Sequence, residues 1–427
     1  MSPSTSNDLN LDISVPSLLI AVSGALDNVH PTLQSHQKRV CVIACKLAQF
    51  LKFNDRQYKD IFLSAIIHDI GALALDNRIN LLKFEEVDTQ IHCQMGSKLI
   101  EQSVLLKHLS PAILYHHHNW ENGKHIPPNI DDKFLLAQLI HISDRVEVLC
   151  HEENILAKAE SIRKLIKSHI STKFYPAYVE AFLEISQKDA FWFELGYEDL
   201  DYCLQKLTPL ESHSVNSTEL EGLTKFISLI IDSRSHFTST HSSGVASCSE
   251  MLSKLMGLSK RSTEMIRIAG YLHDIGKLSI PTELLEKPGS LTHDERALVK
   301  AHIYKSYQIL REINGLEEIT QIAIAHHERI DGSGYPFGKK GENLSLLQRI
   351  MGVADVFTAL NENRPYRPNK SKEEIMNYFE AVVKENLFDK EVVACLKLNY
   401  ETIKNAVDES QHQAKISLKD FWQVSNE

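Results

Sequence analysis

The chain lacks a long hydrophobic run and an excess of basic charge, and each absence excludes a class of protein. The apolar stretch from Val15 to Leu26 is shorter than the roughly 20 residues that a membrane span needs, and no basic n-region with a cleavage site precedes it. With 46 Lys and Arg against 56 Asp and Glu, the formal net charge is -10. This charge excludes bulk nucleic-acid binding through a basic surface. We therefore expect a soluble cytoplasmic protein that uses neither nucleic acid nor a membrane as a partner.

Cysteine, glycine and proline are also scarce. The seven cysteines are scattered and never form a C-x-x-C pair, which argues against a disulfide framework and a zinc ribbon, so we expect them to be reduced and buried. Only 17 glycines and 13 prolines interrupt the 427 residues. Stretches such as Arg39 to Leu51 and Thr263 to Leu272 carry apolar residues at helical spacing. The sequence predicts an all-α fold.

Histidine is the abundant residue, with 21 copies, and its positions reveal an internal duplication. A set of histidines and aspartates in the first half recurs in the same order in the second half, with a separation that grows only slightly along the chain. Such a pattern predicts two tandem copies of one helical domain. The corresponding positions are His36 and His241, His68-Asp69 and His273-Asp274, His92 and His302, His116-His117 and His326-His327, and Asp144 and Asp355.

The boundary between the copies is expected at residues 208–217, where proline, serine and asparagine cluster. We predict a first domain over residues 1–207 and a second over residues 218–427. Residues 408–416 are polar, and we expect them to lie outside the regular structure and to carry no chemistry.

The second copy combines five imidazoles with two carboxylates and contains no thiolate among them. Such a donor set suits Mn, Fe, Ni or Zn better than Ca or a structural zinc. An aspartate next to a histidine could bridge two ions, and paired ions with a shared water are used to hydrolyse phosphate esters. A His-Asp dipeptide alone is also compatible with a surface or capping role. The set comprises His241, His273, Asp274, His302, His326, His327 and Asp355.

Several motifs appear in a fixed order over residues 225–395. They are His241-Ser242, the run His273-Asp274-Ile275-Gly276-Lys277, His302, His326-His327-Glu328-Arg329, the run Asp331-Gly332-Ser333-Gly334-Tyr335-Pro336, Asp355, and Arg364-Pro365-Tyr366-Arg367. In these motifs the sequence resembles the HD-GYP family of bacterial cyclic-dinucleotide phosphodiesterases, a branch of the HD-domain metallohydrolases.

The resemblance implies a site for two divalent transition-metal ions, with Mn or Fe expected first and Ni or Zn also compatible. Asp274 would bridge the two ions and would be catalytic. The first ion would be held by His241, His273, Asp274 and Asp355, and the second by Asp274, His302, His326 and His327.

The resemblance also implies groups that engage the substrate. Lys277 would be catalytic and would face the scissile phosphate, where a cation stabilises developing charge; the alternative is a solvated lysine at a helix end. Arg364 and Arg367 would contact phosphate, although a plain surface role also fits Arg367. Gly334, Tyr335 and Pro336 would form a stiff turn that borders the site and binds substrate. The same loop would dock partners such as diguanylate cyclase domains.

Two positions depart from the family pattern. Some members place a third metal ligand, a Glu, one helical turn before the first histidine, where this chain has Phe237 on a segment that we expect to be helical from Phe226 to His241. We therefore expect two ions. Thr358 replaces a second aspartate that many members carry, which leaves the usual partner of Lys277 in doubt.

The first copy keeps every ligand position but loses the groups that would engage a phosphodiester. Ala72 stands where the second copy has Lys277, His118-Asn119 replaces Glu328-Arg329, and residues 123–128 (GKHIPP) replace the GYP loop. Three readings remain: a second hydrolase, a domain that holds metal without turnover, or an empty scaffold for dimerisation or regulation. Its candidate metal ligands are His36, His68, Asp69, His92, His116, His117 and Asp144.

We therefore expect two tandem HD-type domains, of which the second, an HD-GYP domain, hydrolyses a 3′–5′ cyclic dinucleotide to its linear form and on to mononucleotides. The expected substrates are 3′3′-cGAMP and c-di-GMP, because tandem copies with a degenerate first domain resemble bacterial 3′3′-cGAMP phosphodiesterases. The alternatives are another HD phosphohydrolase that acts on (p)ppGpp or a nucleotide, and a non-catalytic module that senses cyclic dinucleotides. Signalling proteins and a second copy of the chain, in a homodimer, are the expected partners.

Overall fold

The structure, a computed structural model, consists almost entirely of helices, as the sequence predicts. It describes residues 10–30, 33–72, 81–84, 89–124, 131–150, 155–196, 200–209, 215–234, 240–287, 289–362 and 369–424. Within these ranges, the sheet is a pair of two-residue strands, β1 (Asn10–Leu11) and β2 (Val215–Asn216), which run antiparallel. In the described parts of the chain, no helix has both the length and the apolar character that crossing a membrane requires.

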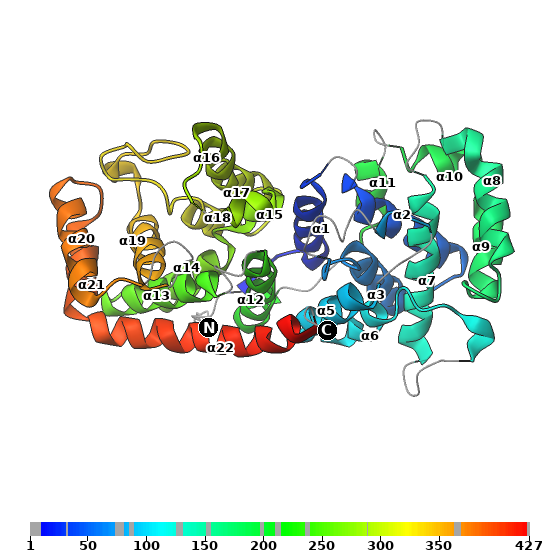
Figure 1. Cartoon of the computed structure of the whole chain (residues 1–427), viewed down its shortest axis with the longest axis horizontal. Coiled ribbons are helices and arrows are strands. Elements are labelled where there is room, and N and C mark those ends of the chain that lie inside the picture. The colour runs from blue at the N-terminus through cyan, green and yellow to red at the C-terminus, as the bar shows by residue number, and fades with distance from the viewer. Residues whose placement is uncertain are drawn as a thin grey trace, which may run out of the picture. The chain divides into compact units, whose positions relative to one another are not determined.

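The chain divides into two compact units, each with its own helices (Figure 1). The N-terminal unit contains Val15–Gln102 and Leu106–Ser212, and the C-terminal unit contains His213–Trp422. Residues 10–14 are grouped with the C-terminal unit, where β1 pairs with β2 in front of the first helix of that unit. The predicted domain boundaries, residues 1–207 and 218–427, stay a prediction.

The N-terminal unit is built from α-helices and short 3-10 helices. In chain order these are α1 (Val15–Asp27), α2 (His36–Phe50), α3 (Asp55–Ile66), α5 (Gln90–Glu101), η2 (Lys107–Leu109), α6 (Ser110–Leu114), η3 (Glu121–Gly123), α7 (Asp131–Val148), α8 (Ile155–Ser168), α9 (Pro176–Ile185), α10 (Asp189–Phe193) and α11 (Leu200–Leu207).

The C-terminal unit follows β2 with a longer series of helices. These are α12 (Ser217–Ser233), α13 (His241–Leu255), α14 (Lys260–Leu272), η4 (Ile275–Ser279), α15 (Thr282–Leu285), α16 (His293–Lys300), α17 (His302–Leu310), α18 (Glu317–Ala323), η5 (Gly341–Asn343), α19 (Leu346–Asn361), α20 (Lys372–Lys384), α21 (Lys390–Leu398) and α22 (Tyr400–Val424).

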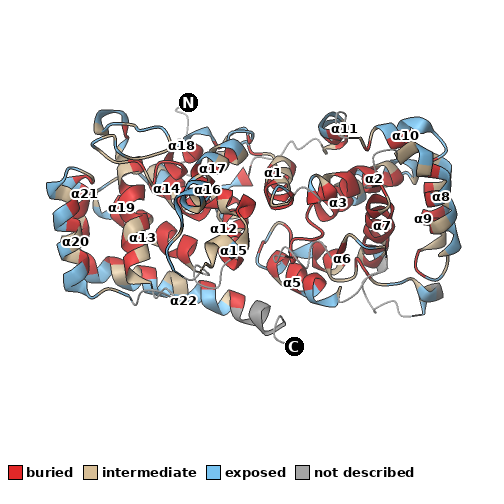
Figure 2. Cartoon of the chain, turned by 45° about the horizontal axis from the view of Figure 1, so that its top comes forward, coloured by how far each residue is buried: buried red, intermediate tan, exposed pale blue. Residues whose placement is uncertain are grey.

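Corresponding helices pack in the same pairs in the two units. In the N-terminal unit α2 packs against α1, α3 and α7, and in the C-terminal unit α13 packs against α12, α14 and α19. These central helices carry buried faces, shown in red in Figure 2. Each unit therefore buries its own apolar core around one central helix, and most of the candidate donors lie at or next to the ends of helices in that core.

Local sequence explains where the three helices that pack against α13 begin. Asn216 and Ser345 cap α12 and α19, and each is joined by a Glu or Gln three residues later in a capping box. Ser259 caps α14 through the backbone N–H of Ser262. These caps satisfy N–H groups that would otherwise lack partners in the first helical turn.

Three expectations about local structure are corrected. Residues 408–416 belong to α22, because Ile403, Val407, Ala414 and Leu418 follow a helical spacing and are buried. The helix expected from Phe226 to His241 does not run through, since α12 ends at Ser233 and α13 begins at His241. All seven cysteines are free, but two of them, Cys203 and Cys395, are only partly buried.

Candidate metal centre

The seven predicted donors of the C-terminal unit come together although they lie on separate helices. His241 begins α13, His273 and Asp274 follow the end of α14, and His302 begins α17. The pair His326-His327 follows α18, and Asp355 lies within α19. Their ligating atoms form three overlapping groups in which all donors lie within 4.8 Å of one another. The groups are His241, His273 and Asp355; His273, Asp274 and His326; and His302, His326 and His327.

Backbone carbonyls hold three of these imidazoles in a common orientation. The Nδ1 atoms of His273, His302 and His326 each contact the carbonyl oxygen three residues earlier, at 2.8, 2.5 and 2.8 Å respectively. A ring that donates from Nδ1 presents the Nε2 lone pair on its other side. All three Nε2 atoms are buried and have no hydrogen-bond partner. Buried acceptors of this kind fit divalent metal ions.

Asp274 lies at the centre of the group and faces histidines with both oxygens. Its Oδ1 lies 3.2 Å from Nε2 of His302 and 3.8 Å from Nε2 of His326. Its Oδ2 lies 3.2 Å from Nε2 of His273 and accepts a hydrogen bond from Lys277. Burial alone would raise the pKa of Asp274, but His273 and Lys277 hold it well below its ordinary value. Asp274 is therefore an ionised carboxylate with one oxygen toward each group of imidazoles.

The protonation states of His326, His327 and Asp355 follow from burial and from the groups next to them. Burial and the neighbouring His327 hold the pKa of His326 well below its usual range, and burial lowers the pKa of His327 to about 4. Burial would raise the pKa of Asp355, but its contact with His241 and the nearby imidazoles lowers it strongly. At neutral pH the pair His326-His327 is neutral and Asp355 is ionised, which are the forms that bind metal.

Glu362 is a residue of this site that the sequence motifs do not reveal. Its two oxygens lie 3.1 and 3.2 Å from Nδ1 of His241, whose Nε2 lies 3.2 Å from Oδ1 of Asp355. Gln411 of α22 donates to Glu362 at 2.8 Å. A carboxylate on the outer nitrogen of a histidine directs the inner nitrogen toward a metal. Glu362 therefore orients His241, and α22 supports Glu362.

The loop that contains Gly334, Tyr335 and Pro336 (the GYP loop) is built around the buried carboxylate of Glu328. This carboxylate accepts the backbone N–H groups of Phe337 and Lys339, each at 2.9 Å. The N–H of Tyr335 donates to the carbonyl oxygen of His327 at 3.1 Å, and the two rings lie 4.8 Å apart. A Cβ on Gly334 would lie 2.3 Å from a backbone nitrogen of the preceding turn, so this position requires glycine. The loop therefore packs directly on a metal-site histidine.

A second glycine, Gly276, holds the turn of residues 273–277 (HDIGK) against α17. A Cβ on Gly276 would lie 1.9 Å from the carbonyl oxygen of His302. The N–H of Gly276 donates to Oγ of Ser306 at 2.9 Å, and this hydroxyl donates to the carbonyl oxygen of His273 at 3.0 Å. The contact brings His302 close to Asp274 and places Lys277 beside the carboxylate.

Three of the predicted positions lie outside the described residues. They are Arg364 and Arg367, expected to contact phosphate, and Phe237, expected to replace a third metal ligand.

Comparison with known proteins agrees with this geometry. Residues 225–392 match the HD domain family, whose members bind divalent metal ions. This match covers an HD domain in the C-terminal unit. This chain is 29% identical over 421 residues to the 3′3′-cGAMP-specific phosphodiesterase 1 of Vibrio cholerae, covering 96% of this chain and 95% of that protein. It is 32% identical over 245 residues to a cyclic di-GMP phosphodiesterase of Thermotoga maritima, covering 57% of this chain and 63% of that protein.

The crystal structure of a cyclic GMP-AMP specific phosphodiesterase of Vibrio cholerae has a similar fold. It matches 94% of this chain and 98% of its own chain with a TM-score of 0.61 at 22% sequence identity. The likeness extends over both units, so the two chains share the all-α architecture along nearly the whole length of this chain.

The N-terminal unit also brings its predicted donors together. Oδ1 of Asp69 lies 3.4 Å from Nε2 of His92 and 3.5 Å from Nε2 of His116. Its Oδ2 lies 3.6 Å from Nε2 of both His36 and His68. The remaining two donors, His117 and Asp144, also approach each other: Nδ1 of His117 lies 3.9 Å from Oδ2 of Asp144. This arrangement repeats that of the HD domain in the C-terminal unit.

Two buried charged residues distinguish the N-terminal cluster. The guanidinium of Arg145 donates to Oδ2 of Asp144 at 2.7 Å, whereas the HD domain has Val356 at the corresponding position. Glu147 lies 2.5 Å from Nδ1 of His36 and also accepts from Arg39 at 2.6 Å. Ala72, which stands where the C-terminal unit has Lys277, is buried. The N-terminal cluster therefore has a buried cation beside the candidate ligand Asp144, and a buried alanine where the other unit has Lys277.

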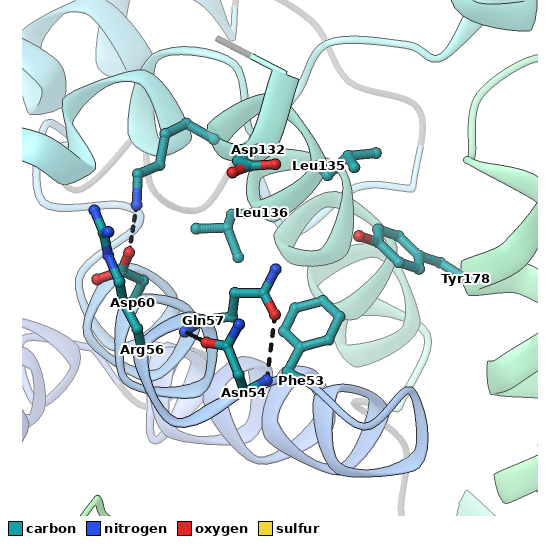
Figure 3. Close-up of a pocket in the computed structure, with 10 residues that line it drawn as sticks. Phe53, Asn54, Arg56, Gln57, Asp60, Asp132, Leu135, Leu136 and Tyr178 are labelled. Atoms are coloured by element: carbon teal, nitrogen blue, oxygen red, sulfur yellow. Dashed lines mark hydrogen bonds and ion pairs between the residues drawn. The ribbon is translucent and has the colours of Figure 1, made fainter.

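A separate pocket of the N-terminal unit lies between α3, α7 and α9, and none of the candidate metal donors lines it (Figure 3). One of its two carboxylates, Asp60, is bound by Lys133 and by His108, the latter at 2.9 Å. Burial would raise the pKa of Asp60, but these two partners lower it. The carboxylate is therefore ionised and neutralised by its neighbours, which suits a structural ion pair better than proton transfer.

Proposed function

We propose that the C-terminal HD domain hydrolyses a 3′–5′ cyclic dinucleotide, 3′3′-cGAMP or c-di-GMP, to the linear dinucleotide and on to mononucleotides. The observation that carries this proposal is the buried donor set around Asp274, in which both oxygens face imidazoles and three Nε2 atoms have no hydrogen-bond partner. The relatives named as 3′3′-cGAMP and cyclic di-GMP phosphodiesterases support the substrate class.

The donor groups divide into two sets that share Asp274. We propose two divalent ions, Mn or Fe first and Ni or Zn as alternatives, with His241, His273 and Asp355 on one side and His302, His326 and His327 on the other. Two such ions, when bound, lower the pKa of a water molecule and stabilise the attacking and leaving oxygens of a phosphodiester.

The chain's own groups have separate tasks in this proposal. Asp274 holds both halves of the site together, and Glu362 keeps His241 oriented. Lys277 lies beside Asp274 with 22% of its side chain exposed, so its ammonium group can reach from the carboxylate toward a phosphoryl oxygen. Arg364 and Arg367 remain proposed phosphate contacts, and Gly334, Tyr335 and Pro336 a proposed wall of the substrate site.

Surface features next to the GYP loop favour its proposed second role in partner docking. Phe337 is 44% exposed and Tyr304 is 45% exposed, and their rings lie 6.4 Å apart. Exposed aromatic side chains of this kind are enriched at protein interfaces. Diguanylate cyclase domains and a second copy of this chain remain the proposed partners.

The N-terminal cluster is proposed to hold metal without turnover. Ala72 removes the cation that would contact a phosphoryl oxygen, and Arg145 occupies one oxygen of Asp144. Replacing His68 and Asp69 together by Ala is therefore expected to leave hydrolysis intact.

Product chromatography tests the function directly. The full chain is incubated with 3′3′-cGAMP, c-di-GMP, c-di-AMP and, separately, (p)ppGpp in Mn²⁺, beside Asp274→Ala and the exposed-carboxylate control Asp294→Ala. We expect linear product from the wild type and from Asp294→Ala, and none from Asp274→Ala, since the shared carboxylate is lost. Binding of a cyclic dinucleotide without product would instead indicate the non-catalytic module, and turnover of (p)ppGpp alone would indicate another HD phosphohydrolase.

A further inference from the structure

His241 differs from other imidazoles of the C-terminal centre in what holds it. The Nδ1 atoms of His273, His302 and His326 each contact the carbonyl oxygen three residues earlier. His241 is the first residue of α13, and its Nδ1 contacts the carboxylate of Glu362 instead. The position of this histidine therefore depends on segments that are remote in sequence.

A buried aspartate of the preceding helix, α12, holds the beginning of α13. Oδ2 of Asp232 accepts the backbone N–H of Ser242 at 3.0 Å, and Oδ1 accepts the hydroxyl of the same serine at 2.8 Å. Asp232 is only 2% exposed. Thr240, at the N-cap position of α13, makes no side-chain capping bond. Asp232 therefore takes the place of a local cap and fixes the residue that directly follows His241.

The N-terminal unit repeats this contact at the position that the duplication predicts. Asp27 precedes His36 by nine residues, as Asp232 precedes His241. The carboxyl group of Asp27 is buried and accepts the backbone N–H and the side-chain amide of Gln37, each at 3.1 Å. Glutamine and serine differ at this position, so the element that the two units share is the carboxyl group on the backbone N–H.

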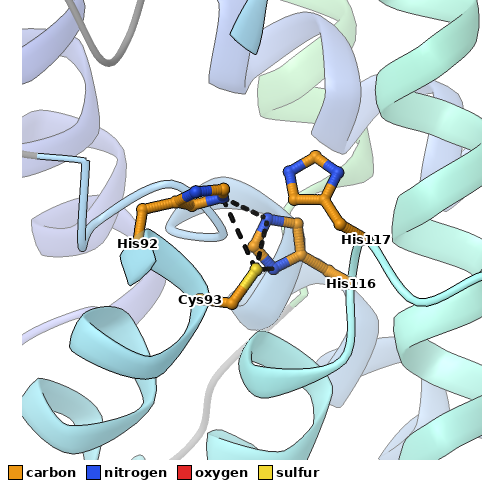
Figure 4. Close-up of side chains that lie close together, drawn as sticks. All are labelled: His92, Cys93, His116 and His117. Carbon is orange, nitrogen blue, oxygen red and sulfur yellow. Dashed lines mark hydrogen bonds between the residues drawn. The ribbon is translucent and has the colours of Figure 1, made fainter. Parts of the chain in front are cut away.

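The histidine that begins a helix in the N-terminal unit is also held by two carboxyl groups. Nδ1 of His36 lies 2.5 Å from Glu147. His116, the middle imidazole in Figure 4, and His68 instead contact carbonyl oxygens three residues earlier, at 2.6 and 2.9 Å. In each unit, therefore, the helix-starting histidine has one carboxylate on its ring and a second carboxyl group on the next residue.

We propose that Asp232 is a positioning residue of the C-terminal metal centre, a role that rests on the proposed two-metal site. Nε2 of His241 lies 3.2 Å from Oδ1 of Asp355, and residues of a metal or catalytic site must be held to within about 0.5 Å. Glu362 sets the direction of the ring, and Asp232 fixes the backbone that carries the ring. Both oxygens of Asp232 are occupied by Ser242, so Asp232 acts through α13 and is not itself a ligand.

Titration calorimetry with Mn²⁺ on the full chain, without substrate, tests this role. The parent protein carries His68→Ala and Asp69→Ala, which remove donors of the N-terminal cluster, so that the heat reports on the C-terminal centre. We expect Asp232→Ala to weaken the binding of one Mn²⁺ ion about 10-fold. This value is the lower end of the range for outer partners of metal-bound histidines, because Asp232 acts through the backbone. Asp232→Asn keeps an oxygen that can accept from Ser242, so its loss of affinity should be smaller.

Asp389→Ala is the control for a loss of stability alone. Asp389 is 8% exposed and caps α21 by accepting the N–H groups of Glu391 and Val392, but α21 carries none of the seven donors. We expect this variant to melt at a lower temperature and to keep the Mn²⁺ affinity of the parent.

Circular dichroism checks the fold of each variant, and Asp232→Asn carries the test if Asp232→Ala does not fold. Unchanged affinity in the folded Asp232 variants, an equal loss in Asp389→Ala, or no Mn²⁺ binding by the parent would overturn the proposal. Because no substrate is present, a selective loss of affinity supports the role of Asp232 even if the chain hydrolyses no cyclic dinucleotide.

Discussion

Removing the carboxylate of Glu362 is expected to weaken metal binding without removing any proposed ligand. Its oxygens contact Nδ1 of His241 at 3.1 and 3.2 Å, and only 10% of its side chain is exposed. A hydrogen bond to a charged group at such a site is worth about 1.5–3 kcal/mol, which corresponds to about 10-fold to 150-fold in binding. This range matches the 10–100-fold that outer partners of metal-bound histidines typically contribute.

Two variants separate the charge of Glu362 from its shape. Glu362→Ala loses both, so the Mn²⁺ concentration that half-activates the enzyme should rise about 10-fold to 100-fold. Glu362→Gln keeps an oxygen that can accept from His241 and should show a smaller rise. Gln411→Ala, which removes the support from α22, should have the smallest effect.

The assay follows hydrolysis of a cyclic dinucleotide as a function of free Mn²⁺. The control is Glu380→Ala, which removes an exposed carboxylate that pairs with Lys397. Rates at saturating Mn²⁺ should stay close to the wild type for all variants, because the missing group orients a ligand and contacts no substrate. An unchanged half-activation concentration in Glu362→Ala would refute the reasoning, and a lower rate that extra Mn²⁺ cannot restore would assign Glu362 a different role.

Three further predictions follow from the described contacts. Lys277→Ala should retain both ions in elemental analysis but lower kcat, because it removes a charge beside Asp274 and no ligand; loss of metal would contradict this role. Gly276→Ala should destabilise the C-terminal unit by at least about 1–3 kcal/mol in denaturant unfolding, since its Cβ would lie 1.9 Å from a carbonyl oxygen of His302. Asp60→Asn should lower stability at pH 7 by about 1 kcal/mol. The folded-state pKa of Asp60 is lowered by its partners, so this difference should vanish as the pH falls through that pKa, and a difference that persists in acid would contradict it.

Repetition and periodicity made much of the fold and the donor set predictable. Apolar residues at helical spacing predicted an all-α chain, and the structure confirms that class. Positions such as His68-Asp69 and His273-Asp274 were recognisable because the same residue types recur in the same order in both halves. Each of these histidines also makes a local contact that sequence spacing implies, with Nδ1 on a carbonyl three residues earlier.

Residues whose role depends on a distant segment could not be found in this way. Glu362 acts on His241 from the far end of α19, and Gln411 reaches Glu362 from a segment whose polarity had suggested irregular structure.

The sequence by itself determined the helical class, the duplication and the identity of the donor residues, because these depend on local periodicity and on residue order. The tertiary structure decided which side chains orient and charge those donors. Arg145 and Val356 occupy corresponding places, but only packing shows that one of them delivers a buried cation to Asp144. The physical reason is that electrostatic and hydrogen-bond partners are set by distances in space, and helices far apart in sequence supply them.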